Sequence, residues 1–286
     1  MSLSDALAVP MSDALSVVVV NSLVARGSVG GRASAFVLER LGFGVTFAPT
    51  VLLPWHPGHG PGTRIVVDSG LLADLADKAE PAAGCLTGYF GDPAQVALTE
   101  RLVAGLRAST PGSLVLCDPV VGDSGRFYVS EPVREAVRAI ARTADIVTPN
   151  RFELAFLAGV DPAALADNAS LVAAARSLRR PEVVVTSAFA GPGETANLLV
   201  TPERVERVVH RAVPRAPHGT GDLVAALHLA GRLRGASPRD ALAAAAAATL
   251  ALVELADGGD ELPLARGQAF FAAPPGHVRV EAFADG

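Results

Sequence analysis

The chain has 286 residues, 50% of them hydrophobic, and a formal net charge of −5. This length is enough to bury a large core in one α/β domain or in two small ones. The negative charge and the lack of a Lys/Arg-rich block argue against nucleic acid or an anionic membrane as the main partner.

No stretch of the sequence is predicted to cross a membrane. The longest apolar runs cover residues 15–20 and 241–256, and the second is rich in alanine and too short for a full span. The N-terminus has no basic segment ahead of an apolar one, so no export signal is expected. Cys85 and Cys117 are too few for a disulfide framework and are expected to be buried thiols. We therefore expect a cytoplasmic protein.

Strand and helix signals alternate along the chain, after a segment (1–14) that we expect to be a flexible tail. The patterns predict strands over 15–20, 45–51, 84–89, 113–119, 144–150 and 182–188, an antiparallel hairpin over 196–213, and helices over 31–42, 71–79, 94–108, 133–142, 150–159, 163–180, 222–234 and 238–256. This alternation predicts an α/β fold with a mostly parallel sheet and helices on both faces. No linker or repeat divides residues 15–286, so we expect a single domain, with residues 54–64 as a loop over the site.

Polar residues follow the predicted strands at their carboxyl ends, where ligands bind in folds of this kind. These residues are Asn21 and Ser22 after the first strand, Tyr89, Asp118, Asn150, and the pair Thr186 and Ser187.

The segment "HGTGDLVAA" (218–226) places two glycines and a carboxylate at the predicted start of a helix. Gly219 and Gly221 allow the backbone to approach a ligand closely because they have no Cβ. With Thr220 they form a turn in which free N–H groups and the positive end of the helix dipole suit a migrating phosphoryl group. Asp222 could then accept the proton of a substrate hydroxyl. The alternative is that Asp222 only caps the helix, and the tetrapeptide alone favours neither interpretation.

Further oxygen ligands come from "LCDPVVGDSGRFYV" (116–129) and "TPNRFE" (148–153). Asp118 and Asp123 lie in the first segment, and Thr148, Asn150 and Glu153 in the second. Each segment alone is explained by turn chemistry, but their convergence on one sheet edge favours Mg²⁺ held together with nucleotide phosphates.

Other common site patterns are missing from the sequence. There is no Walker A segment, no GxGxxG, no HExxH and no CxxC. His56 and His59 in "HPGH" are separated by Pro and Gly, so we expect a loop or a substrate contact there and no zinc site.

Together these motifs resemble the pyridoxal kinase family, within the ribokinase-like kinases, over roughly residues 15–255. The resemblance is carried, in family order, by "NSLVARGSVGGRASAFVLERLGF", "TVLLPWHPGHG", "LTGYFGD", "LCDPVVGDSGRFYV", "DIVTPNRFELAFLAG", "VVVTSAF" and "HGTGDLVAA". It implies a three-layer ribokinase-like fold and a homodimer. It also implies ATP-dependent phosphorylation of the 5′-hydroxymethyl group of pyridoxal, and of pyridoxine and pyridoxamine.

The resemblance assigns expected roles by position. Asp222 is the expected base, and the Gly219–Gly221 amides form the expected anion hole. Mg²⁺ and the phosphates are assigned to Asp118, Asp123 and Glu153, a K⁺ or Na⁺ ion to Thr148, the nucleotide to Asp118, Asn150, Thr186, Ser187 and Thr220, and the pyridine substrate to Ser22, His56, Tyr89 and Asp222.

The sequence also departs from the family's pattern, mainly near the substrate. This leaves two alternatives: a kinase of hydroxymethylpyrimidine or another small heteroaromatic alcohol, and a catalytically weak ligand-binding homologue. Hydroxymethylpyrimidine kinases usually have Cys where this chain has Asp222, which favours pyridoxal. The departures are Asn21 for Gln, Gly31 and Trp55 for Asn, Pro57 for Thr, His59 for Tyr, and Val224 for Phe.

Overall fold

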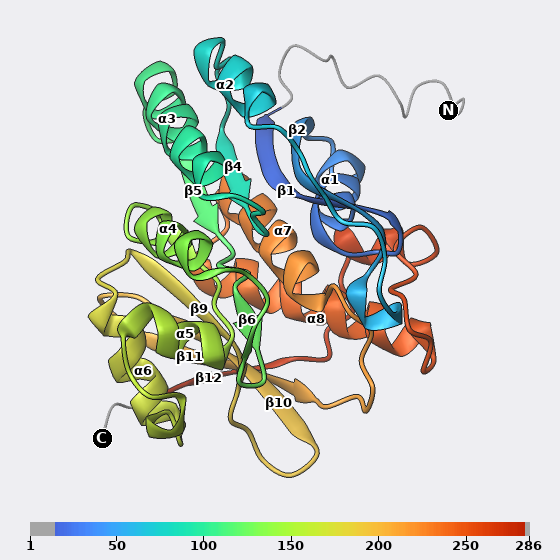
Figure 1. Ribbon diagram of the computed structural model, residues 1–286. Coiled ribbons are helices and arrows are strands. Elements are labelled where there is room, and N and C mark those ends of the chain that lie inside the picture. The colour runs from blue at the N-terminus through green and yellow to red at the C-terminus, as the bar shows by residue number, and fades with distance from the viewer. Residues whose placement is uncertain (1–14, 284–286) are drawn as a thin grey trace.

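The computed structural model describes residues 15–283, and the expected tail over residues 1–14 lies outside the described residues. Within that range the chain forms a ten-stranded sheet and a separate two-stranded hairpin (Figure 1). In spatial order the sheet contains β12 (Arg279–Ala282), β11 (Val205–Arg211), β10 (Glu194–Val200), β9 (Glu182–Ala188), β8 (Ile146–Val147), β5 (Leu114–Cys117), β4 (Gly84–Thr87), β1 (Ser16–Arg26), β2 (Gly44–Trp55) and β3 (Ile65–Val66). The hairpin pairs β6 (Gly122–Asp123) with β7 (Arg126–Phe127).

The centre of the sheet is parallel and its two edges are antiparallel. The pairs from β9 through β8, β5, β4 and β1 to β2 all run in parallel, whereas β10, β11 and β12 on one side and β3 on the other are antiparallel additions. The predicted hairpin over 196–213 is confirmed as β10 and β11. The mostly parallel sheet is therefore confirmed as well.

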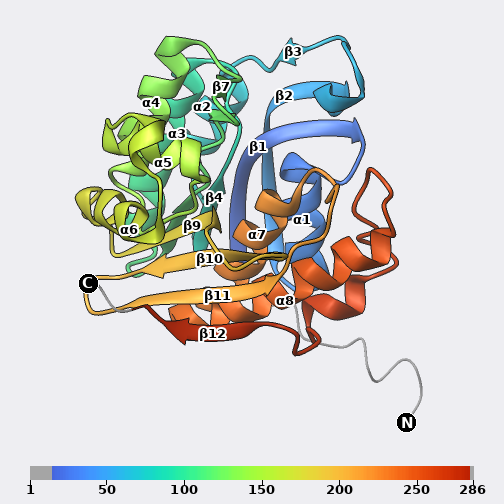
Figure 2. The same ribbon diagram turned by 90° about the horizontal axis from the view of Figure 1, so that it is seen from below.

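Helices cover both faces of the sheet (Figure 2). The run of valines in β1 fits this arrangement, because Val17 and Val19 pack into the core on one face while Val18 and Val20 pack into the core on the other. Helices α1 (Gly30–Arg40), α7 (Thr220–Leu233) and α8 (Pro238–Ala256) line the first face, and α2 (Gly70–Asp77), α3 (Pro93–Ser109), α4 (Glu131–Ala141), α5 (Arg151–Ala158) and α6 (Asn168–Ser177) line the second.

Most of the predicted elements are present, with differences at their ends. The prediction that Asn21 and Ser22 follow the first strand is wrong, because β1 continues to Arg26 past an irregularity between Asn21 and Leu23. The helix predicted over 163–180 is split, since Pro162–Ala164 forms a single 3₁₀ turn and α6 begins only at Asn168. The strand predicted over 144–150 keeps two residues, because Pro149 has no N–H for the ladder. Both cysteines are free and buried, as expected. No helix among residues 15–283 has the length and hydropathy of a membrane span.

Candidate active site

The site lies where the parallel strands end and α7 begins. Gly219 precedes α7 with φ of 94°, a left-handed conformation that favours glycine. A Cβ at this position would collide with the carbonyl oxygen of Ser28 and lie 2.9 Å from Cγ1 of Val29. At Gly221 the same atom would meet nothing within 4 Å, so that turn is open. The first glycine is thus required by close packing, and the second leaves room for a ligand.

Asp222 sits in the first turn of α7 but does not cap it. The N-cap position belongs to Gly219, and no side-chain capping bond is made there. The Asp222 carboxylate turns toward β1 and α1, where Oδ2 accepts from the Gly30 N–H at 2.9 Å and Oδ1 accepts from Nδ2 of Asn21 at 3.2 Å. Burial raises the pKa of Asp222, and these two donors oppose that shift. The capping interpretation is therefore not supported.

Asp118 lies near Asp222, and Glu153 lies near Asp118. Asp118, directly after β5, is 7% exposed, and the hydroxyl of Thr148 donates to its Oδ1 at 3.2 Å. Burial, together with the charge of Asp222, raises the pKa of Asp118 to about 8. Glu153 is also buried, and burial and the charge of Asp118 raise its pKa well above the usual range. Carboxylates gathered in this way create a strong demand for a cation.

Glu153 and Asn150 form a capping box at the start of α5. Oδ1 of Asn150 accepts from the Glu153 N–H at 2.9 Å, and Oε2 of Glu153 accepts from the Asn150 N–H at 3.0 Å. The other oxygen of Glu153 accepts from the Val121 N–H at 3.1 Å, and Nδ2 of Asn150 donates to the carbonyl of Gly122 at 2.9 Å. The pair therefore fixes the loop that leads from Asp118 to the β6–β7 hairpin. Asp123, within that hairpin, is exposed.

Two adjoining cavities open beside the GTGD turn. They have volumes of about 380 Å³ and about 300 Å³, and both are lined by Thr186, Ser187, Thr220 and Gly221. The larger cavity also contacts Asn150 and the hairpin residues Asp123, Ser124 and Gly125. The predicted nucleotide residues Asn150, Thr186, Ser187 and Thr220 are thus brought together, whereas Asp118 lines neither cavity.

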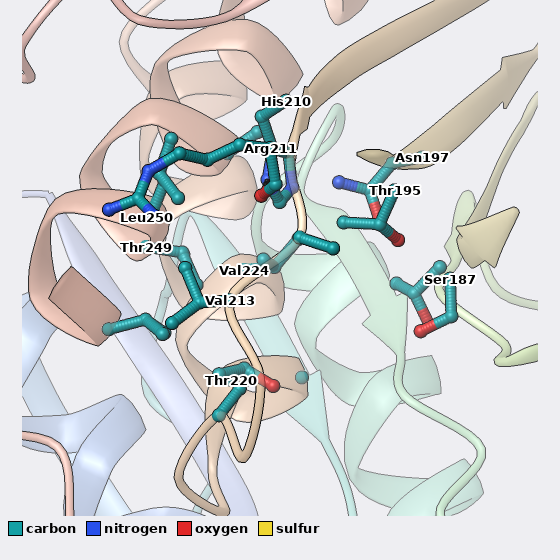
Figure 3. A pocket seen from close by; sticks show the side chains of 16 residues that line it. Ser187, Thr195, Asn197, His210, Arg211, Val213, Thr220, Val224, Thr249 and Leu250 are labelled. Carbon is teal, nitrogen blue, oxygen red and sulfur yellow. Dashed lines mark hydrogen bonds between the residues drawn. The ribbon is translucent and has the colours of Figure 1, made fainter. Parts of the chain in front are cut away.

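The smaller cavity contains polar residues that the sequence analysis missed (Figure 3). Thr195 and Asn197 project from β10 on one side, and Thr249 and Leu250 come from α8 on the other. The Thr249 hydroxyl is buried and has no hydrogen-bond partner among the described residues. The side chain of Asn197, 6% exposed, likewise bonds to no other residue of the described range. The available signal was a polar alternation in "ETANLLV" and a single Thr within an alanine-rich helix.

The predicted substrate residues Ser22 and Tyr89 line neither cavity. The N–H groups of both residues donate to Oδ1 of Asn21, at 2.7 Å and 2.9 Å. Ser22 is also packed against Gly30, where a Cβ would lie 2.7 Å from its Oγ. Both residues are therefore linked to Asp222 through Asn21.

His56 lies in a loop that folds back over the GTGD turn. Its ring stacks on that of His218 with a centroid distance of 4.1 Å, and its Nδ1 accepts from the Gly58 N–H at 3.1 Å. Burial, followed by the nearby His218 and His59, lowers the pKa of His56 to about 4, so it is neutral at pH 7. His59 pairs with Asp260 at 3.4 Å. No group of three or more His, Cys, Asp or Glu side chains suited to a metal occurs in the described part of the chain.

Comparisons with known proteins identify the family of the chain. The profile of the family described as phosphomethylpyrimidine kinase matches residues 88–262. The chain is 36% identical over 278 residues to the pyridoxal kinase PdxY of Deinococcus radiodurans, an alignment that covers 89% of this chain and 92% of the relative. It is 37% identical over 263 residues to a pyridoxine/pyridoxal/pyridoxamine kinase of Bordetella avium, covering 86% and 88%.

Solved structures agree on the fold. The chain is similar to pyridoxal kinase from Leishmania donovani in complex with ADP and pyridoxine, with a TM-score of 0.85, 27% identity, and coverage of 94% of this chain and 99% of that one. It is also similar to pyridoxal kinase from Entamoeba histolytica, with a TM-score of 0.87, 21% identity, and coverage of 94% and 100%. The chain therefore belongs to the pyridoxal kinase family and has its ribokinase-like fold.

Proposed function

We propose that the protein transfers the γ-phosphoryl group of ATP to the 5′-hydroxymethyl group of pyridoxal, as in vitamin B6 salvage. The observation that carries this proposal is the placement of Asp222. Its carboxylate, in the first turn of α7, is held by Asn21 of β1 and by Gly30 at the start of α1, next to the open Gly221 turn that lines both cavities. Asn21 also links it to the Ser22 and Tyr89 segments.

Asp222 is the proposed base. Its two hydrogen-bond donors and the N-terminus of its own helix favour the charged carboxylate, whereas burial makes that carboxylate a better proton acceptor. As the substrate oxygen attacks the γ-phosphorus, its proton passes to Asp222 and the bond to the β-phosphate oxygen breaks. The product is a phosphate ester together with ADP.

The Gly219–Gly221 turn is the proposed anion hole. None of the backbone hydrogen bonds within residues 15–283 uses the amide of Thr220 or Gly221 as a donor, so both can face a phosphoryl oxygen. These amides are fixed before the reaction by the close packing of Gly219, and donors that need no rearrangement stabilise developing charge best.

We assign the nucleotide to the two cavities. The phosphates would lie along Thr186, Ser187, Thr220 and Asn150, which line the larger cavity next to the turn. The adenine ring would enter the smaller cavity, which has a volume of about 300 Å³ and lies between β10 and α8. The unpartnered side chains of Asn197 and Thr249 offer hydrogen bonds to the polar edge of a purine there.

Mg²⁺ is assigned to Asp118, Asp123 and Glu153 together with the nucleotide phosphates. Asp118 fits this role, because Thr148 occupies only one of its two carboxylate oxygens. No three metal-binding side chains cluster among the described residues, so at any moment one or two of these carboxylates would hold the ion and phosphate and water would complete its shell. When bound, the ion neutralises charge on the β- and γ-phosphates. A K⁺ or Na⁺ ion is assigned to the vicinity of Thr148.

Ser22, His56 and Tyr89 are the proposed contacts of the pyridine ring. Tyr89 is half-buried, and its backbone is held from two sides, by Asn21 and by the Thr50 hydroxyl, which donates to its carbonyl at 2.6 Å. His56 is held in place by its stack on His218, and burial, more than its histidine neighbours, lowers its pKa and keeps it neutral. A rigid wall of this kind orients a flat ring without adding charge.

Phosphorylation of hydroxymethylpyrimidine is the second candidate. The family profile that matches residues 88–262 bears the description phosphomethylpyrimidine kinase, and the loop with Trp55, Pro57 and His59 departs from the pyridoxal kinase pattern. The test is ATP consumption by the purified protein with pyridoxal, pyridoxine, pyridoxamine and hydroxymethylpyrimidine supplied separately. The highest kcat/KM with pyridoxal supports the proposal, and consumption with hydroxymethylpyrimidine alone supports the second candidate. Equal, slow consumption with every compound would support a ligand-binding homologue.

A homodimeric state and a cytoplasmic location complete the proposal. The first follows from the family resemblance, and the second from the lack of an export signal in the sequence and from its two thiols. Light scattering on the purified protein tests the first, and fractionation of cells that express it tests the second.

A further inference from the structure

Asn21 joins three parts of the site that are far apart in the sequence. It lies at an irregularity of β1 and is only 1% exposed. Its Oδ1 accepts from the N–H of Ser22 at 2.7 Å and from the N–H of Tyr89 at 2.9 Å. Its Nδ2 donates to Oδ1 of Asp222 at 3.2 Å. One buried amide thus contacts the base and both substrate-side segments.

The orientation of this amide is fixed by its partners. Backbone N–H groups can only donate, so the two of them demand the carbonyl oxygen of Asn21 and leave its NH₂ group for the carboxylate. Gly88 leaves the amide no space to move, since a Cβ there would lie 2.7 Å from Oδ1. A flipped amide would point its NH₂ group at the N–H groups of Ser22 and Tyr89, and its oxygen at the carboxylate of Asp222.

We infer that Asn21 is a positioning residue that aims the Asp222 carboxylate and fixes it relative to the strand end that carries Tyr89. This inference rests on the proposed role of Asp222 as the base. The Gly30 N–H holds Oδ2 of Asp222 at 2.9 Å, and Asn21 holds Oδ1. Donors on two different oxygens define the plane of the carboxylate, whereas one donor alone would leave the group free to turn. Asn21 makes this contact without touching the phosphate cavities.

Asn21→Asp is the direct test, because it keeps the shape of the side chain and an oxygen for the N–H groups of Ser22 and Tyr89. Its second oxygen faces Asp222 in place of the NH₂ group, so the two carboxyl groups either repel each other or share one proton, and in both cases Asp222 is a poorer proton acceptor. We expect kcat with pyridoxal to fall by about ten- to a hundredfold, the effect of losing one hydrogen bond to a charged group. KM for pyridoxal and Kd for ATP should each change by less than about threefold.

The same substitution in the Asp222→Asn background distinguishes an effect that acts through Asp222 from a general loss of structure at the site. There it should change the residual turnover by less than about twofold, because residues that act as a unit do not give additive effects. Asn168→Asp is the matched control, since this buried amide bridges the N–H and carbonyl of Phe189, at 3.0 and 2.8 Å, away from the site. It should lower Tm and leave kcat unchanged. If Asn21→Asp does not fold, Asn21→Ser replaces it with the same expectations, because its hydroxyl is too short to reach Asp222.

Three results would overturn the inference: wild-type kcat in Asn21→Asp, an equal loss in both backgrounds, or a loss confined to KM. Failure of the proposed function is distinguishable from all of these. In that case the wild-type protein does not phosphorylate pyridoxal, or Asp222→Asn keeps its turnover, whatever Asn21→Asp does.

Discussion

Replacing Asp222 by Asn probes the chemistry of the site with the smallest change of shape. The carboxylate accepts one hydrogen bond on each oxygen, from Gly30 at 2.9 Å and from Asn21 at 3.2 Å. An asparagine offers one acceptor oxygen, so its NH₂ group must face one of these two donors. The variant therefore loses the proton acceptor and one favourable contact together.

The expected magnitudes follow from this geometry. Loss of a positioned base typically costs about 10²- to 10⁴-fold in turnover, and we expect kcat to fall within that range. The lost hydrogen bond lowers stability, but removal of a buried charge raises it, as the raised pKa of Asp222 indicates. We expect Tm to stay within about 4 °C of the wild type, which corresponds to about 1 kcal/mol in a chain of this size.

ATP affinity should hardly change, because Asp222 lines neither of the two cavities assigned to the nucleotide. The assay is steady-state phosphorylation of pyridoxal, with ATP binding measured separately by calorimetry. Asp240→Asn is the matched control, since Asp240 occupies the same position in the first turn of α8, three residues after the N-cap Ser237. It should keep wild-type kcat. A kcat for Asp222→Asn within about tenfold of the wild type would refute the role of this carboxylate as a general base.

Three further predictions concern the surroundings of the base. Gly219→Ala should lower kcat by at least about tenfold and lower Tm, because a Cβ there collides with backbone, whereas Gly42→Ala, with φ of 83° and open space, should lower only Tm. Burial raises the pKa of Asp118 from 3.8 to about 8, so the folded protein keeps a proton that the unfolded chain releases, and stability should fall as pH rises from about 4 to about 8. Asp118→Asn should weaken this pH dependence and raise Tm at pH 8 in calorimetric scans while abolishing most turnover; an unchanged pH dependence would contradict the shifted pKa. Asn197→Leu and Thr249→Val should each raise KM for ATP by about two- to tenfold and weaken the preference for ATP over purine riboside triphosphate. An unchanged KM would show that the adenine ring binds elsewhere.

The layout of the sheet and the position of Asp222 at the start of a helix could be predicted because both leave local patterns. The buried valines of β1, the helical spacing after it and the Pro-terminated strand before Asp118 each indicate one element, and parallel connectivity then brings the strand ends to one edge. The turn at Gly219 could also be predicted, since glycine directly ahead of a helix is typical of a backbone that turns sharply or approaches a neighbour closely.

The contacts of the predicted residues could not be predicted in the same way. Asn21 and Asp222 are 201 positions apart, and no local spacing indicates that they bond. Gly31, a departure from the family pattern, is explained by its neighbour, because a Cβ there would collide with the ring of Phe47. The stack of His56 on His218 depends in the same way on two loops that meet only in the folded chain.

The smaller cavity was missed for a different physical reason. Its polar residues, Asn197 and Thr249, lie within a strand and a helix whose patterns are otherwise those of a buried core. A polar residue at such a position has the same local pattern whether it faces a cavity or bonds within the core. Only the folded structure shows that both side chains remain without partners among the described residues.

The central claim is that this chain makes a phosphate ester at the 5′-hydroxymethyl group of pyridoxal. The most direct measurement is a ³¹P spectrum, supported by mass spectrometry, of the purified protein incubated with ATP, Mg²⁺ and pyridoxal, beside a reaction with 5′-deoxypyridoxal, which lacks the acceptor hydroxyl. We predict pyridoxal 5′-phosphate and an equal amount of ADP in the first reaction, and neither in the second. Inorganic phosphate in place of the ester, or no reaction at all with pyridoxal, would contradict the account.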